Sequence, residues 1–537
     1  MTKNKNVHTL LYLLPLLLVS IFYSIDKSII QTAINGGLIL SGIVVFPSEY
    51  TNVTNVYFNG WTILHQITGF FLKLNINAEL ISIIIIFFSN TFHTFGIFLL
   101  SKGVTKSSLF AVTLALWSII LRHNFGHTDY PVLIFSEHSY GMLSLSLFTL
   151  IVGLVANNNF RLFGFFSIIL IGIHLVVGLW VLSIIIFIYF LQKKFIKKKL
   201  IYFKKISIGI TVGLIPILIS LYVFSTTTVD KILLDVDSFQ IYMSAWDHHR
   251  NNFSINYSYL FKTILLVILS FSLLVFLDKN DLKKNLNFML LFIIITCLGS
   301  SLIYLAYKIF PNFFPSLIVR GMPTRLSLLH TLVGYPLLLS IIFFFIKHFI
   351  KIPSFISGNK KIKILALLVL PISILFLVNA NNIGKNIIKR FDVFNENFSK
   401  HKNIEEKKFW ASVRNLKTEG YFVTTINSIT PTIVYGNKPY ILNVSSLDHI
   451  PYHPETAKEV KNIIENIYGL DFNNPPKKYV GGLKDEWYKE IFEERSQKIW
   501  SNLSEEFNLS GIIIPNNWNL KINKNFSYDK FAIYLIK

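Results

Sequence analysis

Long apolar runs separated by short polar loops dominate the first two thirds of this chain. Runs of about 18 or more apolar residues are long enough to cross a bilayer as helices. The loops alternate between Lys-rich segments and segments that hold His, Asp, Glu and a few Arg. The Lys-rich loops are 102–106, 192–205, 279–284 and 347–363, and the others are 122–137, 226–257 and 311–325. Because positive charge in short loops marks the cytoplasmic side, we predict a polytopic α-helical membrane protein whose candidate chemistry lies on the exoplasmic side.

The charge pattern predicts about eleven transmembrane helices, with the N-terminus in the cytoplasm and the C-terminus outside. Nine are expected near 10–25, 78–100, 104–121, 132–155, 206–225, 259–277, 286–309, 327–345 and 364–378. Residues 163–191 are expected to form two more, turning between His174 and Trp180, because one helix would place the lysines of 193–205 outside. Residues 29–46, interrupted by glycines, are interpreted as a re-entrant or interfacial segment, with a short span as the alternative. Apolar residues at helical spacing from Asn59 to Leu74 predict an amphipathic helix in the membrane interface.

The chain changes character after residue 378, where charged residues and four tryptophans appear. Strand-like runs at 421–425, 432–435, 512–514 and 531–536 alternate with helical periodicity at 454–468 and 487–509. About 150 residues is a normal size for one domain. We therefore expect a transmembrane domain over 1–378, with outer loops 26–77, 122–131, 226–258 and 310–326. A soluble exoplasmic α/β domain is expected over 379–537.

Composition excludes other classes of protein. The chain has 537 residues, of which 52% are hydrophobic, so it does not resemble a soluble protein. Its net charge of +22 is concentrated in predicted cytoplasmic loops. Orientation and contact with anionic lipid explain this charge, and no nucleic-acid partner is expected. The single cysteine, Cys297, allows neither an intramolecular disulfide nor a cysteine-based metal site.

Two carboxylates, Asp26 and Glu49, lie in the first outer loop. A carboxylate held at the membrane surface can deprotonate an acceptor hydroxyl or help to hold a divalent cation, Mg²⁺ or Mn²⁺. The alternative for Glu49 is a solvated loop carboxylate. Asp26 has the same alternative, or pairs with Lys27.

The second outer loop is denser in ionisable residues. The spacing of His123, His127 and Asp129 can bind a metal ion if the segment is ordered. Glu137 and His138 fall just inside the next apolar run, where an ionisable pair facing a cavity is a functional candidate. The alternative is a polar loop with interfacial His and Tyr side chains.

Four further residues carry candidate chemistry. His174 lies at membrane depth, so it lines a wet cavity or is a packed histidine at a tight turn. Asp247 lies in a polar group beside an outer helix end, with a solvated loop as the alternative. Arg320 and Arg325 lie at the mouth of a predicted span, where the guanidinium fork suits a phosphate. Their alternative is a salt bridge to an outer-loop carboxylate.

This layout resembles the GT-C class of membrane glycosyltransferases. The residues that carry the likeness are Asp26, Glu49, the 59–74 helix, the hairpin Gly-Ile-His-Leu-Val-Val-Gly around His174, and Arg320 with Arg325. The likeness covers most of the chain in layout but few residues in motif, and the first loop has no Asp-x-Asp pair. It implies transfer of a sugar from a polyprenyl-phosphate carrier in cell-envelope glycan assembly, at the exoplasmic face of a bacterial inner membrane.

The resemblance also implies roles for individual residues. Glu49, Asp26 and Asp129 would be the catalytic carboxylates, as base or ligand of a divalent cation. Membrane lipid and the polyprenyl-phosphate sugar would be the partners. Substrate and lipid phosphate would be held by Arg320, Arg325, His174, Glu137 and Asp247.

Two other classes of function remain open from the sequence. A transporter or flippase would carry ionisable groups in the middle of its spans and broken helices in matched halves. Here nearly all charges lie at helix ends. A non-catalytic envelope scaffold would use the C-terminal domain to bind partners. The donor sugar, the acceptor and the oligomeric state are not determined by the sequence.

Overall fold

The computed structural model divides the chain into two compact units. The helical unit comprises Met1–Ile30, Glu79–Ile219 and Ser254–Ser399, and the mixed unit comprises Gln31–Ala78, Ser220–Phe253 and Lys400–Lys537. The residues that the structure describes are 2–25, 30–120, 139–191, 199–225, 234–247, 291, 294–296, 299, 301–310, 333–334, 336–344 and 404–536 without 478 and 480. Within these residues the chain is largely helical, with one small sheet near its C-terminus.

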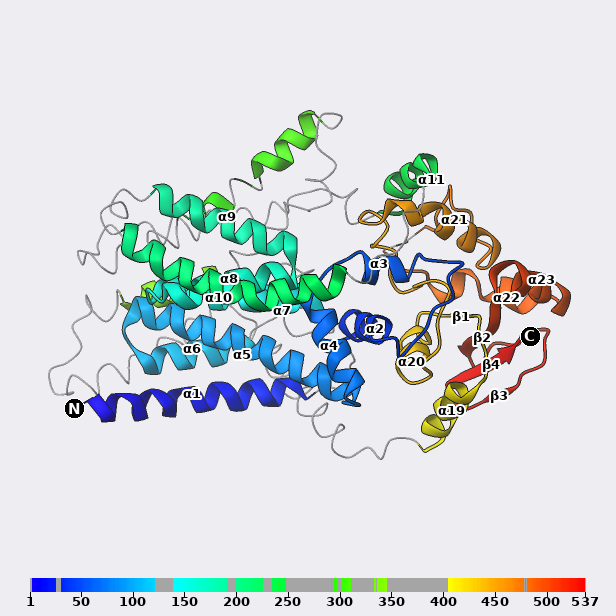
Figure 1. Cartoon of the computed structure of the whole chain (residues 1–537), viewed down its shortest axis with the longest axis horizontal. Helices are drawn as coiled ribbons and strands as arrows, with labels where there is room; N and C mark the ends of the chain where they lie inside the picture. The colour runs from blue at the N-terminus through cyan, green and yellow to red at the C-terminus, as the bar shows by residue number, and fades with distance from the viewer. Residues whose placement is uncertain are drawn as a thin grey trace. The chain divides into compact units, whose positions relative to one another are not determined.

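The helical unit is built from long apolar helices (Figure 1). They are α1 (Thr2–Ser24), α5 (Ala78–Thr105), α6 (Ser108–Ile120), α7 (Ser139–Ala156), α8 (Phe160–Ile173), α9 (Leu175–Leu191) and α10 (Lys199–Ser225). By length and composition, two helices of the described part can cross a membrane, Ala78–Thr105 and Lys204–Phe224. The other apolar stretches found there are shorter, at 10–17 residues, such as Tyr12–Ser24 within α1 and Leu143–Ala156 within α7. The described helices therefore fall where the early spans were predicted, and the count of about eleven remains a prediction.

Small residues bring the backbones of these helices close together. A Cβ atom on Gly96 of α5 would lie 2.4 Å from the carbonyl carbon of Thr149 in α7. The hydroxyls of Ser89 and Ser146 join the same two helices at 2.7 Å. Close approach of this kind adds van der Waals contact and interhelical hydrogen bonds, on which helix association in lipid depends.

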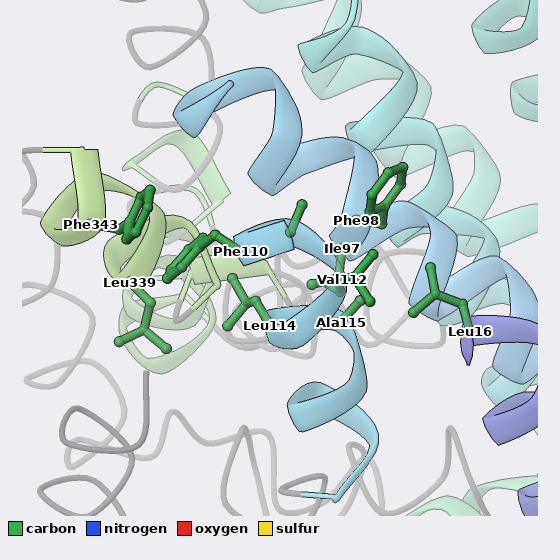
Figure 2. Close-up of a cluster of buried hydrophobic side chains, with 10 residues drawn as sticks. Leu16, Ile97, Phe98, Phe110, Val112, Leu114, Ala115, Leu339 and Phe343 are labelled. Carbon is green, nitrogen blue, oxygen red and sulfur yellow. The ribbon is translucent and has the colours of Figure 1, made fainter. Parts of the chain in front are cut away.

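A cluster of buried side chains joins α1, α5 and α6 to the helical segment 336–344 (Figure 2). Leu16, Ile97 and Phe110 are completely buried in it. The rings of Phe110 and Phe343 stack with their centroids 4.0 Å apart. Offset or stacked aromatic pairs of this kind add to the free energy of burial, so Phe343 fixes segment 336–344 against α6.

The break predicted inside 163–191 is confirmed. Helix α8 ends at Ile173, His174 has extended backbone angles, and α9 begins at Leu175. The two helices pack against each other. A Cβ on Gly178 would lie 2.7 Å from the Cα of Ile171, so glycine is what allows the close contact after the turn.

The mixed unit combines short helices with a four-stranded sheet (Figure 1). Its N-terminal helices are α2 (Gln31–Leu40), α3 (Thr54–Phe58) and α4 (Ile63–Lys73), and its central part is α11 (Val236–Ile241) followed by the π-helix η4 (Tyr242–Trp246). Its C-terminal helices are α19 (Ile404–Asn415), α20 (Ile429–Val434), η7 (Pro454–Thr456), α21 (Ala457–Asn466), η8 (Asp485–Trp487), α22 (Lys489–Glu494) and α23 (Gln497–Phe507). The strands are β1 (Tyr421–Thr424), β2 (Leu509–Pro515), β3 (Phe526–Ser527) and β4 (Phe531–Leu535).

The sheet has the order β1-β2-β4-β3. Strands β1 and β2 are parallel, with Val423 opposite Ile512, and β4 is antiparallel to both β2 and β3. Every residue of β2 except its last is buried. A strand covered on both faces is expected to be continuously apolar, which explains the run Ile512–Ile514.

Three of the four predicted strands are confirmed, and the fourth is wrong. Residues 432–435 were expected to be a strand because Thr, Ile, Val and Tyr favour one. They fall on and just after helix α20 instead. Pro431 lies in the first turn of this helix, where its missing N–H costs no hydrogen bond. The helix expected at 487–509 is divided into η8, α22 and α23, and the side chain of Ser496 caps α23 by accepting from the backbone N–H of Ile499.

Helices α2 and α4 form a closely packed pair. At 10 residues, α2 is about 15 Å long, too short to cross a hydrocarbon core of about 30 Å. It therefore fits the re-entrant or interfacial interpretation of 29–46. A Cβ on Gly37 would lie 2.9 Å from the backbone nitrogen of Gly69 in α4. The two backbones approach this closely because both positions lack a side chain.

Helix α4 is amphipathic as predicted, but its exposed apolar face differs from the expected one. Leu64, which belonged to the predicted stripe, is buried with His65 and Leu72. Ile67, Phe70 and Leu74 are exposed. The helix therefore has two apolar faces, one that packs inside the mixed unit and one that is exposed.

Candidate functional site

The structure describes three of the eight residues assigned to the site. Glu49 and Asp247 belong to the mixed unit, and His174 belongs to the helical unit. The other five predictions lie outside the described residues: Asp26, Asp129, Glu137, Arg320 and Arg325.

Glu49 lies in the loop 47–52, which we call the Glu49 loop and of which Ser48 and Glu49 are exposed. Its side chain is solvent-exposed, and Oε1 accepts a hydrogen bond of 3.2 Å from the Nδ2 of Asn508. The carboxylate is therefore accessible to a substrate, and among the described residues its hydrogen bond to Asn508 is a long one. Asn508 has a left-handed backbone conformation at the end of α23, which asparagine tolerates well.

Tyr421, the first residue of β1, anchors the first half of the Glu49 loop. Its hydroxyl lies 2.6 Å from the carbonyl oxygen of Pro47 and 2.9 Å from that of Tyr50, and it accepts from the backbone N–H of Tyr50 at 3.1 Å. The single phenolic proton is shared between two carbonyl oxygens. Burial raises the pKa of Tyr421, so the hydroxyl stays protonated and remains a donor.

Glu459, in the first turn of α21, anchors the second half of the loop. Its Oε1 accepts from the backbone N–H of Asn52 at 2.7 Å and from the Nδ2 of Asn52 at 2.6 Å. Its Oε2 accepts from the hydroxyl of Thr51 at 3.3 Å. Burial raises the pKa of Glu459, while these hydrogen bonds oppose the shift.

The surroundings of the Glu49 loop are acidic. The pKa of Tyr50 is raised first by burial and then by the negative charges of Glu506, Glu459 and Glu49. A group of carboxylates around one partly buried phenol favours a neutral or cationic ligand over an anionic one. A phosphate would therefore need cationic side chains from elsewhere, the role predicted for Arg320 and Arg325.

Asp247 is enclosed within the mixed unit. It follows η4, and its backbone N–H donates to the carbonyl of Tyr242 at 3.0 Å. The neighbouring Trp246 stacks on Phe472 and donates from Nε1 to the Phe472 carbonyl at 2.7 Å. The side chain of Asp247 is completely buried. The predicted alternative of a solvated loop is therefore wrong for this residue.

Asp247 shares its surroundings with groups that the sequence did not single out. Burial raises the pKa of Tyr479, and the negative charges of Asp448 and Asp247 raise it further. The ring of Tyr479 meets Trp246 edge-on, with centroids 4.8 Å apart. Two carboxylates thus lie near one buried phenol, which stays protonated and can donate a hydrogen bond.

Two histidines follow Asp448 on the same segment. Burial is the main cause that lowers the pKa of His449, to about 4, so its imidazole is neutral at pH 7. Its Nε2 atom is enclosed and has no hydrogen-bond partner among the residues that the structure describes. The Nδ1 of His453 lies 3.4 Å from the Oε1 of Glu455.

Tyr421, Glu459, Asp448, His449 and Tyr479 were not predicted as site residues. The only sequence signal was the dense polar run Asp-His-Ile-Pro-Tyr-His-Pro-Glu at 448–455. Among the described ranges, no three His, Cys, Asp or Glu side chains lie close enough to hold a metal ion. The described residues therefore provide no set of ligands for the divalent cation that was inferred from the sequence.

His174 occupies the turn between α8 and α9. The side chain is partly buried, and its Nδ1 lies 3.5 Å from the backbone nitrogen of Val177. This contact caps the first turn of α9 and gives the histidine a local structural role. Of the two interpretations open from the sequence, the packed histidine at a tight turn fits this geometry better.

Compared with known protein families and with curated protein sequences, the chain gives no match. The interpretation of the site rests on the residues themselves.

Proposed function

We propose that the chain is a membrane protein with about eleven transmembrane helices, an N-terminus in the cytoplasm and its C-terminal region outside. The exposure of α10 supports the membrane location, while the number of spans and their orientation come from the charge pattern of the sequence. In the most hydrophobic 18-residue stretch of this helix only 22% is buried, and Ile215, Leu218 and Tyr222 are exposed. The core helix of a soluble protein would be mostly buried, whereas lipid stabilises an apolar helix that faces outward.

We further propose that the protein is a GT-C-like glycosyltransferase. It would use a polyprenyl-phosphate-linked sugar at the exoplasmic face of a bacterial inner membrane, in cell-envelope glycan assembly. The observation that carries this proposal is the composition of the mixed unit. Residues 31–78 and 220–253, which contain most of the predicted outer loops 26–77 and 226–258, form one unit with the C-terminal region 400–537. The accessible Glu49 and the exposed apolar stripe of α4 belong to that same unit.

The exposed stripe of α4 is suited to a lipid-linked substrate. Ile67, Phe70 and Leu74 are spaced to lie along one side of the helix, and Lys73 follows in its last turn. Trp61 Nε1 donates to the Oγ of Ser220 at 3.0 Å, within the part of α10 that belongs to the mixed unit. An amphipathic helix with an exposed apolar side is suited to the headgroup region of a membrane.

In the proposed reaction, Glu49 is the general base. The acceptor oxygen bonds to the anomeric carbon of the donor sugar while the bond from that carbon to the phosphate oxygen breaks. The hydroxyl proton passes to the Glu49 carboxylate, and polyprenyl phosphate leaves. Arg320 and Arg325 are assigned to the phosphate, Asp26 and Asp129 to assisting carboxylates, and Glu137 to the substrate site.

The test is a transfer assay on the full-length protein in lipid nanodiscs. A panel of radiolabelled polyprenyl-phosphate sugars is supplied with an envelope acceptor fraction, and label that leaves the lipid phase is measured. Glu49→Gln should lower the rate about 100- to 10,000-fold, the usual contribution of a general base. Arg325→Ala should raise the KM for the lipid donor, because it removes a bidentate phosphate partner.

Glu505→Gln is the matched control, because Glu505 is an exposed glutamate on α23 of the same unit. It should retain the wild-type rate. Full activity of Glu49→Gln would remove Glu49 from the mechanism. If the labelled lipid crosses the membrane of proteoliposomes intact and no sugar is transferred, the protein is a flippase and not a glycosyltransferase. An absence of both processes with every donor would favour the scaffold.

A further inference from the structure

The Glu49 loop is held on both sides of Glu49 by side chains that are remote in sequence. Tyr421 contacts Pro47 and Tyr50, and Glu459 contacts Thr51 and Asn52. Glu49 itself is exposed between these anchors, with Asn508 as its side-chain partner. The backbone of the loop is thereby fixed while the Glu49 carboxylate remains accessible.

We propose that Glu459 and Tyr421 are positioning residues that hold the Glu49 loop so that Glu49 meets the acceptor hydroxyl in one orientation. This inference rests on the proposed role of Glu49. A base must lie within hydrogen-bonding distance of the proton that it removes, and a displacement of about 1 Å can lower the rate about 100-fold. A loop of six residues fixed by hydrogen bonds on both flanks satisfies that requirement.

Glu459 holds the loop by accepting hydrogen bonds at both of its carboxylate oxygens. Both bonds from Asn52 end on Oε1, and the Thr51 hydroxyl meets Oε2. A glutamine can accept the two Asn52 bonds at its carbonyl oxygen and donate from its amide nitrogen to the Thr51 oxygen. Glu459→Gln should therefore keep the anchor. Glu459→Ala removes it and leaves the backbone N–H of Asn52 without its acceptor, while the Nδ2 of Asn52 keeps its bond of 3.0 Å to the carbonyl of Ile441.

Loop mobility and activity are measured separately. Ser48 is exposed on the loop, so Ser48→Cys in a Cys297→Ser background accepts a nitroxide label. The spectrum should show an immobilised label in the wild type and in Glu459→Gln, and a mobile label in Glu459→Ala. In unlabelled protein, kcat should fall about 10- to 100-fold in Glu459→Ala, with little change in KM, and return to the wild-type value in Glu459→Gln.

A second variant tests the same loop independently, so that the proposal can still be judged if Glu459→Ala does not fold. Tyr421→Phe keeps the buried ring but removes the hydroxyl that binds Pro47 and Tyr50, so it should loosen the same loop. Glu465→Ala, in the last turn of α21, is the control and should change neither readout.

The possible results separate the two proposals. A Glu459→Gln variant as mobile or as slow as Glu459→Ala overturns the positioning role, as does an immobile label in both Glu459→Ala and Tyr421→Phe. If the spectra change as expected but the wild type transfers sugar from no donor, the anchoring is upheld and the glycosyltransferase function is overturned.

Discussion

The contact between α2 and α4 gives a quantitative test of packing in the mixed unit. A Cβ on Gly36 would lie 2.5 Å from the Cδ2 and 2.6 Å from the Cγ of His65, whereas ordinary contacts begin at 3.4 Å. The imidazole would have to move by roughly an ångström. It is 1% exposed and packs edge-on against Tyr57 at 5.2 Å, so it has little room to move.

Two effects of Gly36→Ala oppose each other. Overpacking of a core typically costs about 1–3 kcal/mol. Alanine is favoured over glycine within a helix by about 1 kcal/mol. We therefore expect a net loss of up to about 2 kcal/mol in the free energy of unfolding. For a unit of roughly 200 residues this corresponds to a fall in Tm of up to about 8 °C.

The assay is thermal unfolding of the purified full-length protein, arranged as a double-mutant cycle. His65→Ala removes the ring that the new methyl group meets. Gly36→Ala should therefore lower Tm in the wild-type background but leave it unchanged or raise it in the His65→Ala background. An equal shift in the two backgrounds would show that His65 does not limit the approach of α2 to α4, and would refute the reasoning.

Three further predictions concern other parts of the chain. Trp246→Ala should destabilise the mixed unit by about 3–5 kcal/mol, because it empties a buried site. Trp246→Phe should destabilise it by about 1 kcal/mol, because it loses mainly the hydrogen bond to the Phe472 carbonyl. The unfolding midpoints of both variants measure these losses, and equal losses would contradict the prediction. The folded pKa of His449 is lowered to about 4 from 6.5, so the stability that its neutral ring contributes is complete above pH 6.5 and is lost as the pH falls toward 4. The loss is at most about 1.4 kcal/mol per pH unit, and Tm measured from pH 7 to pH 4.5 should fall less steeply in His449→Gln than in the wild type. Alkaline phosphatase fused after Lys537 should be active outside the cytoplasm; an inactive fusion at normal protein level would overturn the predicted odd number of spans.

Local sequence patterns predicted the helices and strands well where one physical cause dominates. The turn at His174 followed from charge, because a single helix over 163–191 would have placed a lysine cluster outside. Strands β1, β2 and β4 followed from short β-branched or aromatic runs. The same rule failed at 432–435, where the chain forms the short helix α20 despite the β propensity of these residues. Thr432 lies in α20 because its backbone N–H donates to the carbonyl of Ser428 at 2.9 Å.

The candidate site was predicted only in part, because its contacts join distant segments. Glu49 was chosen as an acid in an outer loop, and the structure describes it as accessible. Nothing near it in sequence indicates Glu459 or Tyr421, which lie about 400 positions away and hold its loop through hydrogen bonds. Asp247 was assigned to the substrate site with a solvated loop as the alternative, yet its side chain is completely buried beside Trp246, which stacks on Phe472.

The sequence by itself determined the apolar helices, the alternation of charge between their loops and the mixed α/β character of the C-terminal region. These features depend on residues a few positions apart, so periodicity and composition encode them. Only the tertiary structure decided that residues 31–78 and 220–253 join residues 400–537 in one unit. It also decided that Glu49 is exposed and that Glu459 anchors the Glu49 loop. That choice depends on burial and on hydrogen-bond partners supplied across hundreds of residues, which no local pattern contains.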